Sequence, residues 1–443
     1  MIKNLLHGNL PGTMTLTRFA DRFSKKTGIL ELMDDLGQAM SSRSDMLMLG
    51  GGNPAHIPEV NKIWRRRTEE ILANGSELEE TLASYDSPQG KQSFLESLAG
   101  LLNREFGWNL SSKNIAVTNG SQNAAFLLLN MFGGTGSDGV KRKVLFPLCP
   151  EYIGYADQSI EEGSLTTPPA KIELTRPGFF KYHVDFDKLD NSTGGIGPDI
   201  SALCVSRPTN PTGNVLTDNE VASLAALARE KDIPFIIDNA YGAPFPHILF
   251  RDVKPYWDEN VILSMSLSKL GLPGVRTGII VADESIIRMI SASNAVISLA
   301  NGSVGQVLVR PLIDSGDILH LSRNVIRPFY QARSESAVAA IQEAFGAGSQ
   351  GAEITCRIHE SEGSIFLWLW LPDLPVSSAV LYERLKARGV LVISGHYFFY
   401  GLENPWTHSE KCLRVSYALA PEKFREAAFI MADEIRRVMN ETK

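Results

Sequence analysis

A lysine, a serine and an arginine lie within one short segment of the chain, and these residue types together could hold a reactive cofactor. Lys269 follows an apolar run, Ser266 stands three residues before it, and Arg276 stands seven residues after it. A lysine amine can attack an aldehyde and form a Schiff base, while hydroxyl and guanidinium groups are suitable donors to a phosphate. The segment therefore predicts a lysine-tethered cofactor that carries a phosphate. Taken alone, it also fits a surface lysine and arginine beside a Pro-Gly turn.

An acidic residue and a tyrosine upstream could complete such a site. A pyridine-type ring nitrogen stays protonated only beside an anionic partner. Asp238 stands at the end of the strand-like segment 235–237, and Tyr241 follows at a spacing that could reach a ring hydroxyl. Because the ligand crevice of an open α/β sheet lies beyond the carboxyl ends of its strands, Asp238 and Lys269 are expected to face the same crevice. A carboxylate that only caps the loop after a strand is the alternative.

A proline-rich turn offers a further polar group. Residues 206–213 contain two prolines, an asparagine and a glycine, which predict a defined turn after a strand. Asn210 is then a rigidly held hydrogen-bonding residue. A plain turn residue is the alternative.

A possible phosphate site lies earlier in the chain. Residues 118–122 precede a helix-like stretch at 123–131. The N–H groups of Gly120, Ser121 and Gln122 are therefore expected to converge at a helix N-terminus, where an anion binds well. An ordinary helix cap needs the same residue types.

The elements that must position these residues form an α/β pattern. Short apolar runs alternate with helical stretches from about residue 112 to 282, which predicts a mainly parallel sheet covered by helices on both faces. Thr217 and Glu220 have the spacing of a capping box, so a helix should follow them to Lys231. The runs expected to be buried strands are 144–146, 202–205, 235–237, 261–263 and 278–282.

The residue pattern of the C-terminal third differs from the alternating pattern before it and predicts a separate α+β unit. A β-prone run at 365–370 and a helical stretch at 381–388 precede a last helix with one apolar face. The residues on that face are Phe424, Ala428, Met431, Ile435 and Val438. The expected division is an N-terminal arm and part of a small domain over 1–60, a large cofactor-binding domain over 61–325, and a small C-terminal α+β domain over 326–443.

Composition excludes several classes of protein. With 44% hydrophobic and 21% charged residues, the 443-residue chain is typical of an ordinary globular protein. Its net charge of -7 argues against a nucleic-acid surface. The four cysteines are widely spaced and indicate neither a zinc site nor a disulfide framework. No apolar run approaches the roughly 18 residues of a membrane span. We therefore expect a cytoplasmic protein with no metal, nucleic-acid or membrane partner.

Seven short motifs stand in the order found in one family. The chain resembles the class I/II aminotransferases, enzymes of pyridoxal phosphate (PLP) fold type I. The resemblance implies an α/β fold with a mainly parallel sheet covered by helices, and a smaller α+β domain formed by the N-terminal segment and the C-terminal third. The motifs that carry it are Tyr85-x-x-Pro-x-Gly90, Thr118-x-Gly-Ser-Gln122, Pro150-Glu-Tyr152, Asn210-Pro-Thr-Gly213, Asp238-x-x-Tyr241, Ser266-x-Ser-Lys269 with Arg276, and Arg414-Val-Ser.

The resemblance also implies a role for each site residue. Lys269 would form the internal aldimine and move a proton, Asp238 would pair with the pyridinium nitrogen, and Tyr241 would hold the ring oxygen; these three form the catalytic set. The implied cofactor-binding residues are Gly120, Ser121, Gln122, Tyr152, Asn210, Asp238, Tyr241, Ser266, Lys269 and Arg276, with Tyr85 of the partner subunit in a homodimer. The implied substrate-binding residues are Arg414, Asn210, Gly51 and Gly52. Arg414 would clamp the substrate carboxylate through a bidentate fork, although a salt bridge would use the same side chain.

Within the family, the likeness is strongest to members that act on small apolar amino acids. The segments that carry it are 27–36, 48–54, 146–155 and 204–214. It implies ping-pong transamination between alanine and 3-methyl-2-oxobutanoate, which gives pyruvate and valine. The alternatives are another small-amino-acid aminotransferase, a PLP-dependent C–S lyase, and a PLP-binding transcription regulator. For the last of these, the roughly 25 residues before Thr27 are too few for a helix-turn-helix module.

Overall fold

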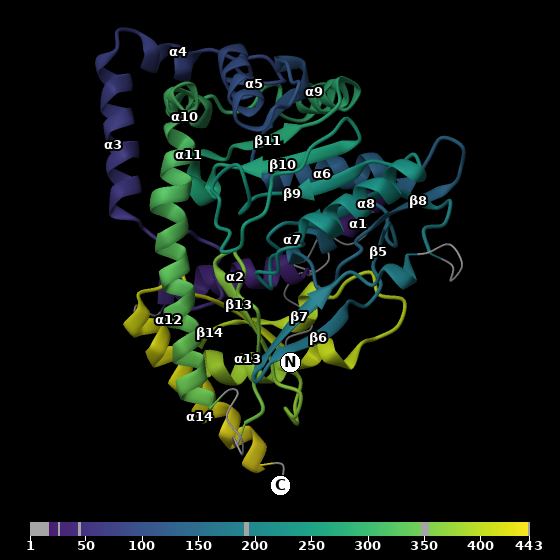
Figure 1. Ribbon diagram of the computed structural model, residues 1–443, viewed down its shortest axis with the longest axis vertical. Helices are drawn as coiled ribbons and strands as arrows, with labels where there is room; N and C mark the ends of the chain where they lie inside the picture. Colours follow the sequence, from purple (N-terminus) through teal and green to yellow (C-terminus); the bar gives the residue numbers. More distant parts are fainter. Residues whose placement is uncertain (1–16, 25–26, 43–45, 190–194, 347–353, 442–443) are drawn as a thin grey trace, which may run out of the picture.

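Two β-sheets dominate the computed structural model, which describes residues 17–24, 27–42, 46–189, 195–346 and 354–441. The larger sheet lies in the upper half of Figure 1 and the second sheet in the lower half. The first sixteen residues of the expected N-terminal arm lie outside the described residues. The expected α/β fold, with a smaller α+β unit, is confirmed.

The larger sheet has the order β2-β11-β10-β9-β8-β4-β3, with β5 beside β4. Pairing along β10-β9-β8-β4-β5 is parallel. Residues of the central strands are almost all buried, as expected for a sheet covered on both faces. Its strands are β2 (Ile115–Thr118), β3 (Gly134–Thr135), β4 (Lys141–Leu145), β5 (Leu165–Thr166), β8 (Ile200–Ser206), β9 (Phe235–Asp238), β10 (Val261–Ser266) and β11 (Gly278–Val281).

Strand β11 departs from the parallel pattern. It pairs antiparallel with both β10 and β2. The connection from β10 contains only the short helical turns η4 (Ser268–Leu270) and η5 (Pro273–Val275). A parallel neighbour would need a longer crossover, usually a helix, so this connection allows only the antiparallel arrangement.

Helices cover the larger sheet. α6 packs against β10 and β11, and α8 packs against β8 and β9 (Figure 1). The expected capping box of α8 is present, because the Thr217 hydroxyl accepts from the Glu220 N–H and the Glu220 carboxylate accepts from the Thr217 N–H. The helices of this half are α3 (Pro58–Ala73), α4 (Glu77–Ala83), α5 (Gln92–Phe106), α6 (Ser121–Phe132), α7 (Ile153–Ala156), α8 (Asp218–Glu230), α9 (Glu284–Ser298) and α10 (Val304–Ser315).

The second sheet combines segments from distant parts of the chain. Its order is β15-β16-β13-β12-β7-β6. Next to it, β1 (Leu47–Met48) pairs with β14 (Val390–Leu391), so the N-terminal segment joins the C-terminal unit. The strands of the second sheet are β6 (Lys171–Arg176), β7 (Phe179–His183), β12 (Arg357–His359), β13 (Phe366–Trp370), β15 (Ile393–Ser394) and β16 (Cys412–Ser416), and its helices are α13 (Ser378–Ala387) and α14 (Pro421–Glu441). The residues expected on the apolar face of α14 are buried.

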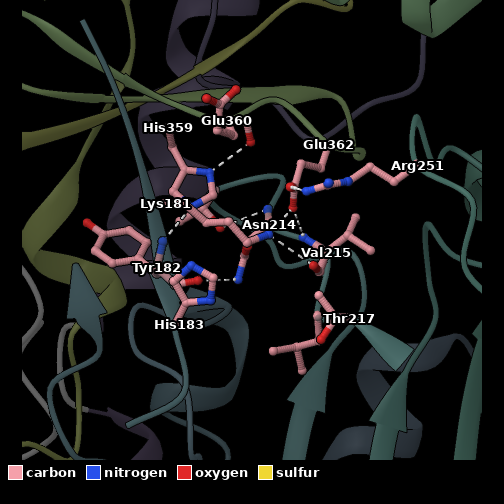
Figure 2. Close-up of polar contacts among 12 residues, drawn as sticks. Lys181, Tyr182, His183, Asn214, Val215, Thr217, Arg251, His359, Glu360 and Glu362 are labelled. Atoms are coloured by element: carbon pink, nitrogen blue, oxygen red, sulfur yellow. Dashed lines mark hydrogen bonds and ion pairs between the residues drawn. The ribbon is translucent and has the colours of Figure 1, made fainter. Parts of the chain in front are cut away.

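The hairpin β6–β7 links the two halves in a way that the sequence did not suggest. It falls inside the range 61–325 expected for the large domain, yet β7 pairs in parallel with β12 of the C-terminal unit. Lys181 on β7 donates to the Glu362 carboxylate and to the Val215 carbonyl at 3.2 Å, and the Val215 N–H donates to Glu362 Oε2 at 2.9 Å (Figure 2). The Arg251 guanidinium contacts the second carboxylate oxygen. Glu362 therefore joins the hairpin, the C-terminal unit and the segment after Asn210.

We expect Glu362→Ala to destabilise the fold strongly. Lys181 is only 4% exposed, so the substitution leaves a buried ammonium group without its carboxylate. Losing one partner of a buried pair typically costs about 3–5 kcal/mol. The free energy of unfolding in urea measures the effect. Glu360→Gln is the matched control, because it breaks an exposed pair with Arg176 and should cost less than about 1 kcal/mol. Equal losses in the two variants would contradict the assignment.

A long helical segment crosses the expected domain boundary at 325/326. α11 (Asp317–Leu321), a π-helical turn over Ser322–Ile326 and α12 (Arg327–Phe345) follow one another directly. A proline lies in the first turn of α12, where its missing N–H is tolerated. Figure 1 shows the segment running from beside the larger sheet down to α14, against which α12 packs. The domain limits stay a prediction.

Two helices precede α3 in the chain. α1 spans Arg18–Ser24 and α2 spans Gly28–Ser42. Within the described ranges, no helix combines the length and the apolar character that crossing a membrane requires.

Candidate active site

A cavity of about 720 Å³ opens at the carboxyl ends of β8, β9 and β10 and reaches β16 of the second sheet. This is where a ligand crevice is expected in an open α/β sheet. Of the residues predicted for the site, the cavity is lined by Gly51, Gly52, Ser121, Gln122, Tyr152, Asn210, Asp238, Tyr241, Ser266, Lys269, Arg276 and Arg414. Residues from distant parts of the chain are thus brought together around one space.

Lys269 lies on η4, directly after β10, and points into the cavity. Its Nζ donates to the Gly52 carbonyl at 2.5 Å and lies 5.0 Å from the centre of the Tyr241 ring. Desolvation, together with the positive charges of Arg414 and Arg276, lowers the pKa of Lys269 to about 8. With this pKa, roughly a tenth of the amine is unprotonated at pH 7 and can act as a nucleophile or a base.

Asp238 ends β9 at the floor of the cavity. Its carboxylate accepts from the Tyr155 hydroxyl and, through Oδ1, from the Ala240 N–H at 2.8 Å. Burial raises the pKa of Asp238 above its ordinary value, although both hydrogen bonds oppose the shift. In the described part of the chain, no Lys, Arg or His forms an ion pair with it. A protonated ring nitrogen would therefore suit this carboxylate, and a ring bound here would find it.

Tyr155 is a site residue that the sequence did not identify. It follows Tyr152 by three residues across the short helix α7, and the two rings meet edge to face with centroids 5.1 Å apart. Both tyrosines line the cavity, and the Tyr155 hydroxyl donates to the Asp238 carboxylate. The sequence could have indicated this role, because residues three apart on a helical turn lie on the same face, as Tyr152 and Tyr155 do.

A cradle for an anion lies at the N-terminus of α6. The preceding residue, Gly120, has a φ of +89°, and a Cβ added to it would lie 2.2 Å from Nη2 of Arg276. Only glycine therefore leaves room for the guanidinium group beside the first turn of the helix. Ser121 and Gln122 begin α6, and Ser266 also lines the cavity on β10, where it pairs with Gly278 of β11. Hydroxyl, guanidinium and helix N–H donors are the set that a phosphate needs, so the cradle fits the phosphate of PLP.

Arg414 supplies a second anion site. The residue is 2% exposed on β16, its Nη1 donates to Asn210 Oδ1 at 2.8 Å, and its Nη2 donates to the Gly50 carbonyl at 2.8 Å. The Phe366 ring centre lies 4.0 Å from its Cζ. Its Nε is buried with no partner among the described residues, which also include no ion pair to Arg414. The salt-bridge alternative therefore has no support there, and a carboxylate would satisfy the free donor.

Two of the predicted residues lie outside the lining. Gly120 stands behind the Arg276 guanidinium, as described above. Tyr85 is 83% exposed and does not line the cavity of its own chain. No group of three or more His, Cys, Asp or Glu that could hold a metal is present in the residues that the structure covers.

An apolar wall of the cavity comes from segments to which the sequence assigned no contact. Ile29 and Met33 of α2 and Met48 of β1 line the side near Arg414, together with Leu419. The sequence of α2 does not indicate that this helix contacts the cavity, because its position depends on tertiary packing.

Known proteins resemble the chain in sequence and in fold. The family model of aminotransferase class I and II matches residues 44–429. The chain is 48% identical over 97% of its length to valine–pyruvate aminotransferase of Escherichia coli K12, all of which is covered. A putative amino-acid aminotransferase from Psychrobacter arcticum 273-4 has a TM-score of 0.91 at 44% identity, covering 97% of this chain and 100% of that one. The valine–pyruvate aminotransferase of Salmonella typhimurium LT2 has a TM-score of 0.84 at 46% identity, covering 94% and 100%. The chain therefore belongs to the class I and II aminotransferase family.

Proposed function

We propose that the chain is a PLP-dependent enzyme that transfers an amino group between alanine and 3-methyl-2-oxobutanoate, giving pyruvate and valine. The observation that carries the proposal is the 48% identity to a valine–pyruvate aminotransferase over 97% of the chain. The phosphate cradle, the carboxylate at the cavity floor and the buried arginine fork support the cofactor and substrate classes.

The chain's own residues suit the steps of such a reaction. When bound, PLP supplies a ring that can delocalise the electron pair left at the substrate Cα. Asp238 would hold the ring nitrogen in its protonated form, and Tyr152 would stack on the ring face. Tyr241 and Asn210 hold the ring oxygen. Lys269 would hold the cofactor through its aldehyde and, as a free amine, would be the group that carries the proton between the substrate Cα and the cofactor carbon.

The phosphate and the substrate carboxylate occupy opposite ends of the proposed site. The phosphate-binding donors are those of Gly120, Ser121, Gln122, Ser266 and Arg276. Arg414 binds the carboxylate, because its buried Nε has no other partner in the described residues. The backbone of Gly51 and Gly52 lies beside Lys269 and approaches the substrate closely.

The apolar wall supports a small aliphatic side chain. The side chains of Ile29, Met33 and Met48 offer no charged partner for an acidic or basic substrate. Methyl groups of valine bury well against such a surface. Discrimination between alanine and valine is then modest, on the order of 1–3 kcal/mol per methylene.

We also propose a homodimer in which Tyr85 of the partner subunit completes the phosphate site. The exposed Tyr85 ring and exposed apolar side chains on α4 and after α9, Leu82 (66%) and Leu299 (58%), support a partner surface. The Asn301 amide donates to the Pro88 carbonyl at 3.0 Å, which places these segments together. Sedimentation of the purified protein tests this assembly. A cytoplasmic location is proposed as well, and it is supported by the free thiols of all four cysteines.

A screen of half-reactions tests the proposed substrates. PLP-loaded protein is mixed with one amino acid at a time, and the loss of the lysine-linked cofactor absorbance is followed. We expect alanine and valine to react, with pyruvate or 3-methyl-2-oxobutanoate formed in a 1:1 ratio to enzyme, and aspartate to react far more slowly. A faster reaction with aspartate would refute the substrate pair.

The same screen distinguishes the proposed reaction from that of a C–S lyase and from that of another aminotransferase. A C–S lyase turns over repeatedly without an oxo-acid acceptor and releases ammonia, whereas an aminotransferase stops after one equivalent. Reaction with a different small amino acid only would point to another aminotransferase of this class.

A further inference from the structure

Glu151 is a buried acid beside the proposed site to which the reaction assigns no role. The residue is 2% exposed, and its neighbour across the contact, Ser206, is 5% exposed. Its carboxyl Oε1 accepts from the Ser206 N–H at 2.9 Å, and Oε2 accepts from the Ser206 hydroxyl at 2.7 Å and the Tyr152 N–H at 3.1 Å. One side chain thus ties the loop of Tyr152 to the end of β8.

The two segments that Glu151 joins both carry parts of the site. Tyr152 and Ser206 line the cavity, and Ser206 leads into the turn that presents Asn210. Asn210 in turn accepts from the Arg414 fork. A shift of the Glu151 carboxyl would therefore move the ring-stacking tyrosine and the carboxylate clamp together.

A third link runs to the C-terminal unit. The Glu151 N–H donates to the Phe398 carbonyl at 3.0 Å, and the Phe398 ring centre lies 5.2 Å from Cζ of Arg414. The backbone of Glu151 thus contacts the C-terminal unit, while its side chain contacts the end of β8.

The surroundings of Glu151 favour its neutral form. The titratable groups that face it are Cys149, Tyr155, Cys204, Asp238 and Tyr400. None of them is a cation, and among the described residues no Lys, Arg or His forms an ion pair with it. Burial raises the pKa of Glu151 to about 8, against the hydrogen bonds from Ser206 and Tyr152.

We propose that Glu151 is a positioning residue, which locks Tyr152 to the end of β8 and thereby sets the alignment of Asn210 and the Arg414 fork. The proposal rests on the proposed function, because it concerns the residues that hold the cofactor ring and the substrate carboxylate. Glu151 contacts neither of them directly, and it acts through Tyr152 and Ser206.

Replacing the side chain with alanine or glutamine tests this role. Glu151→Ala removes the acceptor for three donors, so we expect kcat/KM to fall about 10²-fold, the loss that a displacement of about 1 Å can cause. The loss should lie in kcat as well as KM. PLP should bind the cofactor-free protein more weakly, as measured by titration, and the absorbance band of the bound cofactor should shift.

Glu151→Gln distinguishes the positioning role of the side chain from any effect of its negative charge. The amide keeps an acceptor for the Ser206 N–H and stays neutral at every pH, so it should rescue most of the loss at neutral pH. It should also remove any part of the change in kcat/KM above about pH 8 that arises from ionisation of Glu151, leaving the part that arises from Lys269, whose pKa is also about 8. Ser206→Ala combined with Glu151→Ala should cause little further loss, because the two residues form one contact.

Stability against pH gives an independent readout. The folded chain keeps the Glu151 proton up to about pH 8, whereas the unfolded chain loses it near the ordinary glutamate pKa of 4.5. Between these values the folded form binds more protons, so this group's contribution to stability falls as pH rises. As the pH rises from about 4.5 to about 8, the Tm of the wild type should therefore fall relative to the Tm of Glu151→Gln.

The matched control is Glu434→Gln. Glu434 is a buried carboxylate, 4% exposed, that accepts from Arg384 and Arg388 on the far side of the C-terminal unit. The Glu434→Gln substitution should lower Tm without changing the cofactor absorbance or kcat/KM.

Three results would overturn the proposal. They are unchanged kcat/KM and absorbance in Glu151→Ala, changes in Glu434→Gln of the same kind, and a Glu151→Gln variant as impaired at neutral pH as Glu151→Ala. Wild-type turnover of alanine with 3-methyl-2-oxobutanoate is measured first. Its absence would refute the proposed substrates alone, because PLP affinity and absorbance still report on Glu151.

Discussion

Replacing Lys269 with alanine is expected to abolish covalent attachment of PLP and to lower kcat by roughly 10⁴-fold, the upper range of what a positioned acid–base group supplies. The amine lies on η4 inside the cavity and is the proposed proton carrier, so no neighbouring group can replace it in both tasks. Borohydride reduction followed by mass spectrometry measures attachment. The wild type should gain the mass of the reduced cofactor, and the variant should not.

The Lys269→Ala experiment has a control variant and a rescue by added amines. Lys254→Ala removes an exposed lysine that does not line the cavity, and it should leave attachment and turnover unchanged. Small amines added to Lys269→Ala should restore part of the proton transfer, because the vacated space admits them. Normal turnover or a retained cofactor adduct in Lys269→Ala would remove the central residue from the proposed site.

The second large effect is expected for Arg414→Ala. The substitution removes the only buried guanidinium that lines the cavity in the described residues, and with it the proposed partner of the substrate carboxylate. Truncating one member of a buried charged hydrogen-bonded pair costs about 2–5 kcal/mol. This corresponds to a fall of about 30- to 5,000-fold in kcat/KM for alanine.

Arg414→Lys distinguishes the fork from its charge. Lysine keeps the positive charge but loses the planar pair of donors, so we expect an intermediate kcat/KM. Arg357→Ala is the control from the same sheet, because Arg357 packs on the Trp370 ring and does not line the cavity. A wild-type value of kcat/KM in Arg414→Ala would place the carboxylate elsewhere.

The part of the site built on the larger sheet could be predicted from local sequence. Buried parallel strands read as continuous apolar runs, and their carboxyl ends meet along one edge. Asp238 is aligned with Ser206 on β8 and with Ser264 on β10, so the polar residues after these runs meet at one edge. The capping box at Thr217 likewise needs only its own first turn.

Contacts between distant segments could not be predicted in this way. Lys181 lies in a hairpin whose sequence alternates without indicating a partner, and its pairing with β12 depends on the whole C-terminal unit. The same holds for Ile29 and Met33 in the cavity wall. Tyr155 and Glu151 flank Tyr152 in sequence, but their roles arise only where β8 and β9 bring acceptors and donors against them.

The helical segment through the π-turn has a mechanical consequence. The 19 residues of α12 make a rod about 28 Å long at 1.5 Å per residue. A tilt of about 10° at the π-turn Ser322–Ile326 displaces the far end of such a rod by about 5 Å. Because α12 packs on α14, the C-terminal unit would swing with it and carry Arg414 on β16 toward or away from Lys269. A small rotation at this one irregular turn would therefore become a larger displacement of β16 relative to η4.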